Sequence, residues 1–172
     1  MISAIVCADM NNAIGYKGEL LGRIPEDMQR FKSITENNII LMGRKTWESL
    51  PNKPLLNRIN WVVSRSVPYG KVRGFINDYI ESDLATAIKF INMGHCGEVF
   101  VVGGGEIYKE MLPYCDRIYF TRVYHMYPDA DTYFPKILES TWKLSLYSDI
   151  KQWRDVQYRF EIYDRIGDDL NG

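Results

Sequence analysis

The stretch that decides the fold is Glu98-Val99-Phe100-Val101-Val102-Gly103-Gly104-Gly105-Glu106-Ile107-Tyr108. Residues 99–102 form an apolar run rich in β-branched side chains, which predicts a strand buried on both faces, as in a mostly parallel sheet. Three glycines follow at once, and apolar residues then recur at helical spacing until Pro113. The stretch therefore predicts a strand, a glycine turn and a helix.

The glycine turn is compatible with phosphate binding. Glycines let a ligand approach the backbone closely, and a helix start presents free N–H groups with partial positive charge. A tight connection without any ligand fits such a turn equally well. The turn is not the usual dinucleotide fingerprint, because G-x-G-x-x-G would need a glycine at Tyr108, and the sequence contains no P-loop pattern.

Length and composition indicate a globular protein. The 172 residues are 46% hydrophobic and 25% charged, with a net charge of −1. We expect a single domain over residues 1–172, frayed at 166–172, and neither a nucleic-acid nor a membrane partner. Three cysteines and two histidines at wide spacing predict no disulfide framework and no metal site. The N-terminus reads as a strand rather than a signal peptide, so we expect a cytoplasmic protein, and we expect a monomer.

The rest of the chain alternates strand and helix patterns. Strands are predicted at Ile2–Ala8, 38–42, Ile59–Val63, 71–76 and 117–124, with an extended segment at 131–135 and an antiparallel pair at Trp142–Tyr147 and 156–163. Helices are predicted at Pro25–Thr35, through Trp47 to Leu50, after Asp83 and after the glycine turn. Residues 9–23 read as a long, glycine-containing loop, which is typical of an active-site lid, although a plain surface loop fits the same residues. We therefore expect an α/β fold with a central, mostly parallel mixed sheet of about eight strands, an antiparallel C-terminal edge and about four flanking helices.

Asp27 is a candidate functional acid. It lies in the first turn of the helix Pro25–Thr35, where a carboxylate stabilises the helix dipole in any protein. Phe31 and Ile34 share its face, and Met28 extends that apolar stripe, so the carboxylate should point toward the core. No lysine or arginine is expected on this face, and an unpaired buried charge is costly. A ligand with paired N–H donors would serve as its partner.

Two further strand ends carry cations. Gly43-Arg44-Lys45-Thr46 follows the strand 38–42 and begins a short helix, where cations oppose the dipole unless an anion binds. Two solvated surface cations are the alternative, at a cost of only about 1 kcal/mol or less. Ser64-Arg65-Ser66 closes the strand Ile59–Val63 and offers a hydroxyl and a guanidinium, which suit a phosphomonoester, although an ordinary turn is equally compatible. A dinucleotide carries enough phosphate groups to contact both the turn at residues 103–105 and the turn at Gly43.

In this order the pieces resemble the dihydrofolate reductase family over nearly the whole chain. The motifs that carry the resemblance are Ile14-Gly15, Pro25-x-Asp27-x-x-x-Phe31-Lys32, Met42-Gly43-Arg44-Lys45-Thr46-Trp47-Glu48-Ser49-Leu50, Pro54-Leu55 with Arg58, Ser64-Arg65, Val102-Gly103-Gly104-Gly105-x-x-Tyr108, and Thr121 with Asp131-Thr132-x-Phe134-Pro135. The resemblance implies an oxidoreductase that reduces dihydrofolate to tetrahydrofolate with NADPH, in support of one-carbon metabolism and thymidylate synthesis.

The resemblance also implies a substrate site. Asp27 would grip the 2-amino group and adjacent ring nitrogen of the pterin and promote protonation at N5, and Thr121 would hydrogen-bond Asp27. Arg58 would hold the α-carboxylate of the substrate's glutamate. Asp27 and Thr121 are thus the implied catalytic residues, and the implied substrate-binding residues are Ile5, Asp27, Phe31, Leu50, Leu55, Arg58, Val102 and Thr121.

For the cofactor, the resemblance implies that residues 103–105 pack against the pyrophosphate and nicotinamide, with a cis Gly103–Gly104 peptide bond. Cations and hydroxyls at the strand ends would hold the pyrophosphate and the 2′-phosphate, favouring NADPH over NADH. The full implied cofactor-binding set is Val6, Cys7, Ile14, Gly15, Gly43, Arg44, Lys45, Thr46, Ser64, Arg65, Gly103, Gly104, Gly105, Glu106, Ile107, Tyr108 and Thr132.

One segment departs from the family pattern. Leu20-Leu21-Gly22-Arg23 stands where the family usually carries a Leu-Pro-Trp-like segment, whose tryptophan packs near the pterin and helps hold a water. Another aromatic residue could substitute for it. Two alternatives follow: a related pyrimidine reductase of riboflavin synthesis, which would not need Asp27 and Arg58, and a non-catalytic binding or structural protein that retains the fold.

Overall fold

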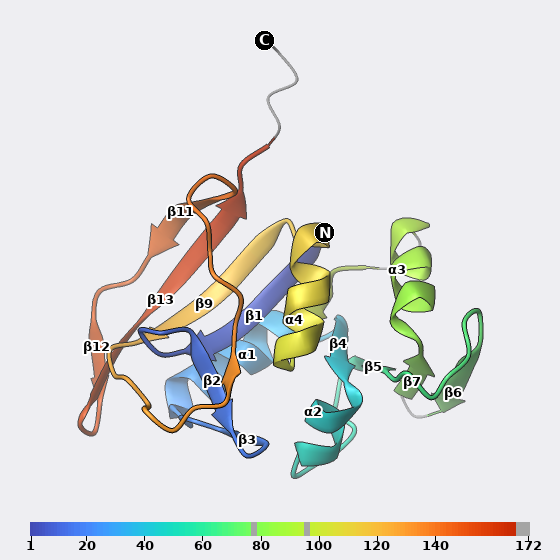
Figure 1. The fold of residues 1–172 in the computed structure, drawn as a ribbon, viewed down its shortest axis with the longest axis horizontal. Helices are drawn as coiled ribbons and strands as arrows, with labels where there is room; N and C mark the ends of the chain where they lie inside the picture. Colours follow the sequence, from blue (N-terminus) through green and yellow to red (C-terminus); the bar gives the residue numbers. More distant parts are fainter. Residues whose placement is uncertain (77–78, 95–96, 168–172) are drawn as a thin grey trace.

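The computed structural model describes residues 1–76, 79–94 and 97–167. Over these residues the chain builds an α/β fold around a ten-stranded sheet, whose main path runs β11-β13-β9-β1-β8-β4-β5-β7-β6 while β12 pairs with β13 (Figure 1). Its strands are β1 (Ile2–Ala8), β4 (Ile39–Gly43), β5 (Ile59–Val63), β6 (Val72–Ile76), β7 (Tyr79–Ser82), β8 (Val99–Val101), β9 (Arg117–Val123), β11 (Trp142–Tyr147), β12 (Lys151–Trp153) and β13 (Val156–Arg165).

The centre of the sheet is parallel and its edges are antiparallel. Strands β9, β1, β8, β4, β5 and β7 pair in parallel, β13 runs antiparallel to β9, and β6 runs antiparallel to β7. The predicted mixed sheet with an antiparallel C-terminal edge is therefore confirmed. The sheet has ten strands rather than about eight because it includes β7 and β12, which are too short to show a clear alternation in the sequence.

Helices cover both faces of the sheet, and alternate residues of each strand decide which face they serve. The helices are α1 (Pro25–Thr35), α2 (Arg44–Ser49), α3 (Leu84–Asn92) and α4 (Gly105–Met111), the last followed by a 3₁₀ turn at Leu112–Tyr114. Ala4 and Val6 of β1 face a core shared with α3 and α4, whereas Ile5 between them faces a second core with Phe31 of α1. The predicted cap of α3 is present, since Thr86 N donates to Asp83 Oδ1 at 3.0 Å.

The segment 9–23 is not a loop throughout, as the sequence predicted. It contains β2 (Ala13–Tyr16) and β3 (Glu19–Leu20), which join β10 (Thr132–Tyr133) in a separate three-stranded sheet, β10-β2-β3 (Figure 1). The prediction was wrong because these short strands are stabilised by pairing with a distant segment, which leaves no periodic pattern in the residues themselves. The segment 9–23 is thus anchored to the stretch around Thr132.

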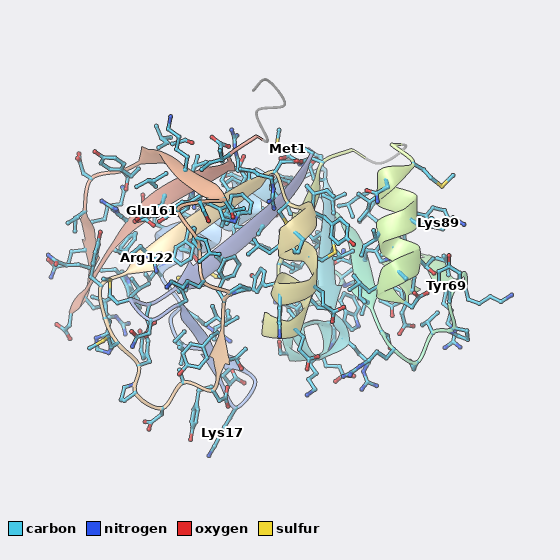
Figure 2. All side chains as sticks on the ribbon, turned by 45° about the horizontal axis from the view of Figure 1, so that its top comes forward. Met1, Lys17, Tyr69, Lys89, Arg122 and Glu161 are labelled. Carbon is cyan, nitrogen blue, oxygen red and sulfur yellow. The ribbon has the colours of Figure 1, made fainter. Side chains whose placement is uncertain are left out.

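The last described residues at the C-terminus are held to the rest of the fold. Ile166 is tied down, because its N–H donates to the Thr141 carbonyl at 2.9 Å; the remainder of the predicted frayed tail, 168–172, lies outside the described residues, as do His95 and Cys96. Charged side chains such as Lys17 and Lys89 project outward (Figure 2). In the described part of the chain, no helix is long and apolar enough to cross a membrane.

Candidate active site

The two glycine turns of the sequence lie against each other. They follow β4 and β8, which are parallel neighbours, so both turns and the starts of α2 and α4 meet at one edge of the sheet. Gly43 N donates to the Gly103 carbonyl at 2.8 Å. A Cβ at Gly43 would lie 3.0 Å from Ile107 Cγ1, a tight contact, and one at Gly104 would lie 3.4 Å from Thr46 Oγ1, so each turn packs against the helix that follows the other.

Gly103 needs to be glycine for two reasons. Its φ is +110°, a region that side chains rarely adopt, and a Cβ there would lie 3.0 Å from the Tyr108 ring. The Gly103–Gly104 peptide bond is cis, which confirms the expectation. Beneath the turn, Tyr108 is buried and donates from its hydroxyl to the Ile5 carbonyl at 2.7 Å. The phenol thus ties α4 to β1.

The strand β10, which pairs with β2 of the segment 9–23, lies against the same glycine turn. Gly15 of β2 is the register partner of Thr132 in β10, and a Cβ at Gly105 would lie 3.0 Å from Thr132 Cγ2. Ile14 beside it is buried in the core. The structure therefore brings together Gly15, Gly105 and Thr132, three residues that the sequence reading assigned to one ligand.

Asp27 points into the protein, as its helical position predicted. Thr121 Oγ1 donates to Asp27 Oδ1 at 2.5 Å, which is the hydrogen bond that the resemblance implied. Cys7 is the register partner of Thr121 on the neighbouring strand, and its thiol also contacts the carboxylate. Burial raises the pKa of Asp27 above its usual value, while the Thr121 hydrogen bond, the charge of Arg30 and the Cys7 contact act in the opposite direction. The acid is therefore held by two strands and one helix.

Two details of the α1 reading were wrong. An arginine does lie on the Asp27 face: Arg30 Nη1 is 3.5 Å from Thr121 Oγ1, because residues three apart on a helix are neighbours. Met28 does not extend the buried apolar stripe, since the residue is 50% exposed and belongs to none of the apolar clusters. It follows Asp27 directly, about 100° further round the helix.

The predicted substrate residues share one apolar cluster. Ile5 belongs to the buried core on the α1 side of the sheet, and the others pack against it partly exposed; they are Phe31, Leu50, Leu55 and Val102. Ile34, Trp47 and Tyr119 also pack against this cluster, although sequence reasoning did not place them in the site. Their signal in the sequence was the shared helical face for Ile34 and the strand alternation for Tyr119.

Arg58 lies at the other end of α1 from Asp27. Its Nε donates to the Leu56 carbonyl at 2.9 Å, and its Nη1 donates to Thr35 Oγ1 at 3.3 Å. Thr35 ends α1, so the acid and the guanidinium lie about 12 Å apart along the helix axis, with the Phe31 ring between them. The apolar cluster is thus bounded by an anion at one end and a cation at the other.

The cations at the strand ends are exposed, and the two arginines are paired with acids. Arg44 Nε lies 3.6 Å from Glu48, and Arg65 Nη2 lies 3.7 Å from Glu106 across two strand ends. Ser64 is buried, with its hydroxyl 2.8 Å from that of Ser66. Because β4 and β5 are parallel neighbours, residues 43–46 and 64–66 leave the sheet at the same edge, next to the glycine turns.

Comparison with known proteins assigns the family. A family model described as "Dihydrofolate reductase" matches residues 1–165. This chain belongs to the dihydrofolate reductase family. Membership makes it an oxidoreductase, and it agrees with the resemblance read from the separated motifs.

Relatives in this family cover most of the chain. The dihydrofolate reductase of Bacillus subtilis (strain 168) is 36% identical over 167 residues, which span 96% of this chain and 95% of the relative. That of Buchnera aphidicola is 38% identical over 169 residues, spanning 95% and 99%. The bifunctional dihydrofolate reductase-thymidylate synthase of Paramecium tetraurelia is 32% identical over 162 residues, spanning 92% of this chain and 33% of the relative.

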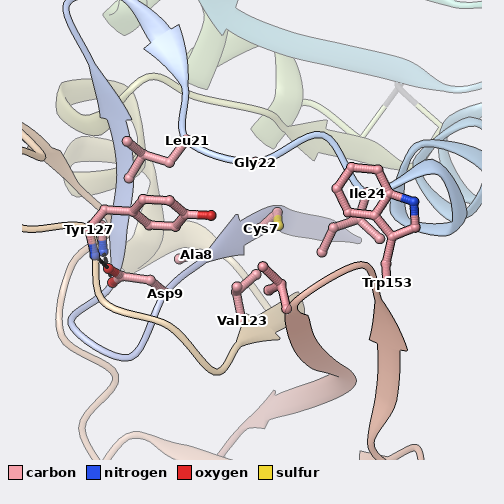
Figure 3. A pocket seen from close by; sticks show the side chains of 11 residues that line it. Cys7, Ala8, Asp9, Leu21, Gly22, Ile24, Val123, Tyr127 and Trp153 are labelled. Atoms are coloured by element: carbon pink, nitrogen blue, oxygen red, sulfur yellow. Dashed lines mark hydrogen bonds between the residues drawn. The ribbon is translucent and has the colours of Figure 1, made fainter.

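The segment that departs from the usual dihydrofolate reductase pattern borders a pocket. Its lining includes Gly22 and Cys7, together with Tyr127 and Trp153 (Figure 3). The Tyr127 hydroxyl points into the pocket and would lie 3.6 Å from a Cβ at residue 22. Two aromatic side chains from distant segments thus stand beside the position where the family usually has tryptophan. Sequence reasoning missed them because neither lies in a recognisable motif.

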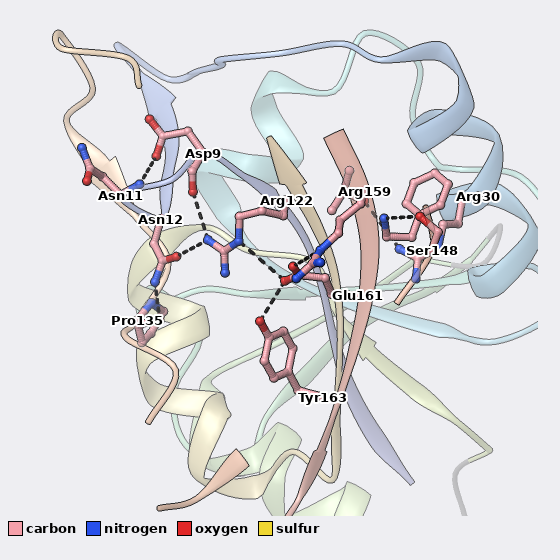
Figure 4. A network of polar contacts seen from close by, with 12 residues as sticks. Asp9, Asn11, Asn12, Arg30, Arg122, Pro135, Ser148, Arg159, Glu161 and Tyr163 are labelled. Atoms are coloured by element: carbon pink, nitrogen blue, oxygen red, sulfur yellow. Dashed lines mark hydrogen bonds and ion pairs between the residues drawn. The ribbon is translucent and has the colours of Figure 1, made fainter. Parts of the chain in front are cut away.

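An ionic network around the buried Glu161 contacts the start of the segment 9–23. Glu161 of β13 is 2% exposed and accepts hydrogen bonds from Arg159 Nε at 2.7 Å and the Tyr163 hydroxyl at 2.8 Å. Arg122 Nε lies 3.6 Å from the same carboxylate, and its Nη1 donates to Asn12 Oδ1 at 2.8 Å (Figure 4). The network therefore connects the C-terminal strands to the residues that precede β2.

Proposed function

We propose that this chain reduces 7,8-dihydrofolate to 5,6,7,8-tetrahydrofolate with NADPH, by hydride transfer to C6 and protonation at N5. Membership of the dihydrofolate reductase family supports the reaction. The observation that carries the assignment of residues is the part-buried Asp27–Thr121 pair, which lies at one end of an apolar cluster that ends at Arg58.

The substrate fits the order of these groups. A pterin has adjacent N–H donors that match the two oxygens of Asp27, and its flat ring suits the apolar surface of Ile5 and Phe31. The aminobenzoyl ring would continue between Leu50 and Leu55, and the glutamate carboxylate would meet the guanidinium of Arg58. The spacing of about 12 Å between acid and cation agrees with a ligand of that length.

The cofactor assignment is supported by the chemistry of the strand ends. Ser64 and Arg65 offer a hydroxyl and a guanidinium, the donors that a 2′-phosphate prefers, and Arg44, Lys45 and Thr46 lie at the same edge. Residues 103–105 form a cradle that a Cβ would fill. NADPH supplies the hydride when bound, and the protein orients it. Thr132, which lies against Gly105, and its register partner Gly15 would enclose the nicotinamide side.

Asp27 supplies the electrostatics of the protonation step. Hydride addition at C6 leaves negative charge on N5, so a proton must arrive there. A carboxylate that binds the 2-amino group and its neighbouring nitrogen favours the protonated ring, and burial strengthens this interaction by excluding water. Thr121 orients the carboxylate through its 2.5 Å hydrogen bond.

We further propose that residues 1–172 act as one domain, as a cytoplasmic monomer. The two free cysteines among the described residues, Cys7 and Cys115, support a reducing compartment. The near-neutral charge supports the absence of a nucleic-acid partner.

The decisive experiment follows the loss of NADPH absorbance in the near ultraviolet, with and without dihydrofolate. We expect oxidation that depends on dihydrofolate, and a much lower rate with NADH. Asp27→Asn serves as the matched variant, because it keeps the size of the side chain and removes the charge. NADPH oxidation that does not respond to dihydrofolate would overturn the proposed function and favour a non-catalytic member of the family.

A further inference from the structure

Arg30 occupies an unusual place for an arginine. It lies half-buried between α1 and the antiparallel edge of the sheet, where its guanidinium carbon is 4.5 Å from the centre of the Phe160 ring and 5.7 Å from that of Tyr119 (Figure 4). When a guanidinium stacks on an aromatic ring, its N–H groups point outward in its own plane. They can therefore still donate to a neighbouring acceptor. The nearest such acceptor is the Thr121 hydroxyl, at 3.5 Å from Arg30 Nη1.

Thr121 connects Arg30 to Asp27. A threonine hydroxyl has one hydrogen to donate and lone pairs to accept with. The hydrogen goes to Asp27 Oδ1 at 2.5 Å, so the lone pairs are turned toward Arg30. Guanidinium, hydroxyl and carboxylate therefore form a chain in which each member polarises the next.

The thiol and the phenols around Asp27 are neutral at physiological pH, and the charged side chains nearby are paired with one another. Burial raises the pKa of the Cys7 thiol and of the Tyr108 phenol, and it also raises the pKa of Tyr158, to about 12. Lys151 lies over the same Phe160 ring at 5.8 Å but is paired with Glu26 at 2.8 Å. Arg159 and Glu161 of β13 are paired with each other. Among the described groups that act on the Asp27 carboxyl, Arg30 is the cation.

We infer that Arg30 is a positioning residue for Asp27, which holds the Thr121 hydroxyl in the donating orientation and keeps the carboxylate ionised over a wider pH range. The inference rests on the proposed role of Asp27 in binding the pterin. Without the cation, the buried acid would take up a proton more readily, and a neutral acid grips the protonated pterin less well.

The test is a titration of the Asp27 carboxyl by ¹³C NMR, with the signal assigned by its loss in Asp27→Asn. The variants are Arg30→Met and Arg30→Gln, which remove the charge, and Arg30→Lys, which keeps it. The control is Arg73→Met, the same change at an exposed arginine of β6, on the far edge of the sheet. This readout needs no turnover, so it separates the inference from the proposed function.

We expect the midpoint to move to higher pH in Arg30→Met and Arg30→Gln, lowering the ratio of ionised to neutral Asp27 roughly tenfold near the midpoint. Arg30→Lys should restore most of the parent behaviour, and Arg73→Met should not change it. The pH profile of kcat/KM for dihydrofolate should shift in the same order. An unchanged midpoint in the charge-removing variants, or an equal shift in Arg30→Lys, would show that Arg30 only packs against the rings.

Discussion

Thr121 and Asp27 are 94 residues apart in the sequence, yet the threonine hydroxyl donates a 2.5 Å hydrogen bond to the carboxylate. The contact arises because β9 pairs in parallel with β1, in a register that sets Thr121 beside Cys7. Both side chains then point to the face that α1 covers. The carboxylate is consequently fixed by the sheet and not only by its helix, and the first two predictions concern this acid.

Asp27→Asn should cripple turnover at neutral pH and recover part of it in acid. Asparagine keeps an acceptor for Thr121 but cannot carry the charge that favours a protonated pterin, a contribution of roughly 10²–10⁴-fold. The variant depends on substrate already protonated in solution, and that fraction grows as the pH falls. A pH–rate profile of both proteins checks this. A variant as fast as the parent at neutral pH would reassign Asp27 to a helix-start carboxylate.

The same substitution should stabilise the fold at neutral pH. Burial raises the pKa of Asp27 in the folded protein, so between the unfolded and folded pKa values the folded state binds more protons, and stability falls as pH rises. Asparagine removes that cost. We expect a larger free energy of unfolding for the variant in urea at neutral pH, with the difference vanishing below about pH 4, the ordinary range of aspartate. A variant less stable than the parent at neutral pH would contradict this reading.

Arg65→Ala should weaken NADPH binding roughly tenfold or more and barely alter NADH binding, because only NADPH carries the phosphomonoester that a guanidinium recognises. Glu106→Gln is the informative companion, since Glu106 lies 3.7 Å from Arg65 and competes for it. That variant should bind NADPH at least as tightly as the parent. Fluorescence titration with both cofactors measures the effects, and equal losses for the two would remove Arg65 from the phosphate site.

Arg58→Leu should raise the KM for dihydrofolate roughly tenfold or more while leaving NADPH affinity nearly unchanged, because the planar fork of arginine matches a carboxylate. Arg58→Lys should recover only part of the loss. Since Arg58 is 8% exposed and donates to Thr35, thermal melts of each variant accompany the kinetics. If KM does not change in a folded Arg58→Leu protein, the residue has a structural role alone.

Glu161→Gln should destabilise the protein by about 3 kcal/mol, because it removes the buried charge that pairs with the half-buried cations Arg122 and Arg159. For a chain of this length that corresponds to a melting temperature lower by roughly 6–12 °C. Glu139→Gln, at an exposed position, is the control and should melt like the parent. Calorimetry of the three proteins decides, and matching melting temperatures would mean that the network contributes little net stability.

The sequence by itself determined the local elements and their order. The apolar run before Gly103, Pro25 at the start of α1 and Asp83 as the cap of α3 each depend on neighbouring residues, and each is found where the pattern placed it. Alternating strands and helices then favour a parallel sheet, because consecutive parallel strands need a crossover connection. Several separated motifs together also sufficed to identify the family.

The tertiary structure alone decided which distant side chains meet. The pairing of β2 with β10, the approach of Tyr127 to Gly22 and the link from Arg30 through Thr121 to Asp27 all join segments far apart in the chain. Periodicity shows which face of an element a residue occupies, but not which element lies opposite or in what register. Those choices follow from the order of strands in the sheet, which is set by the packing of the whole chain.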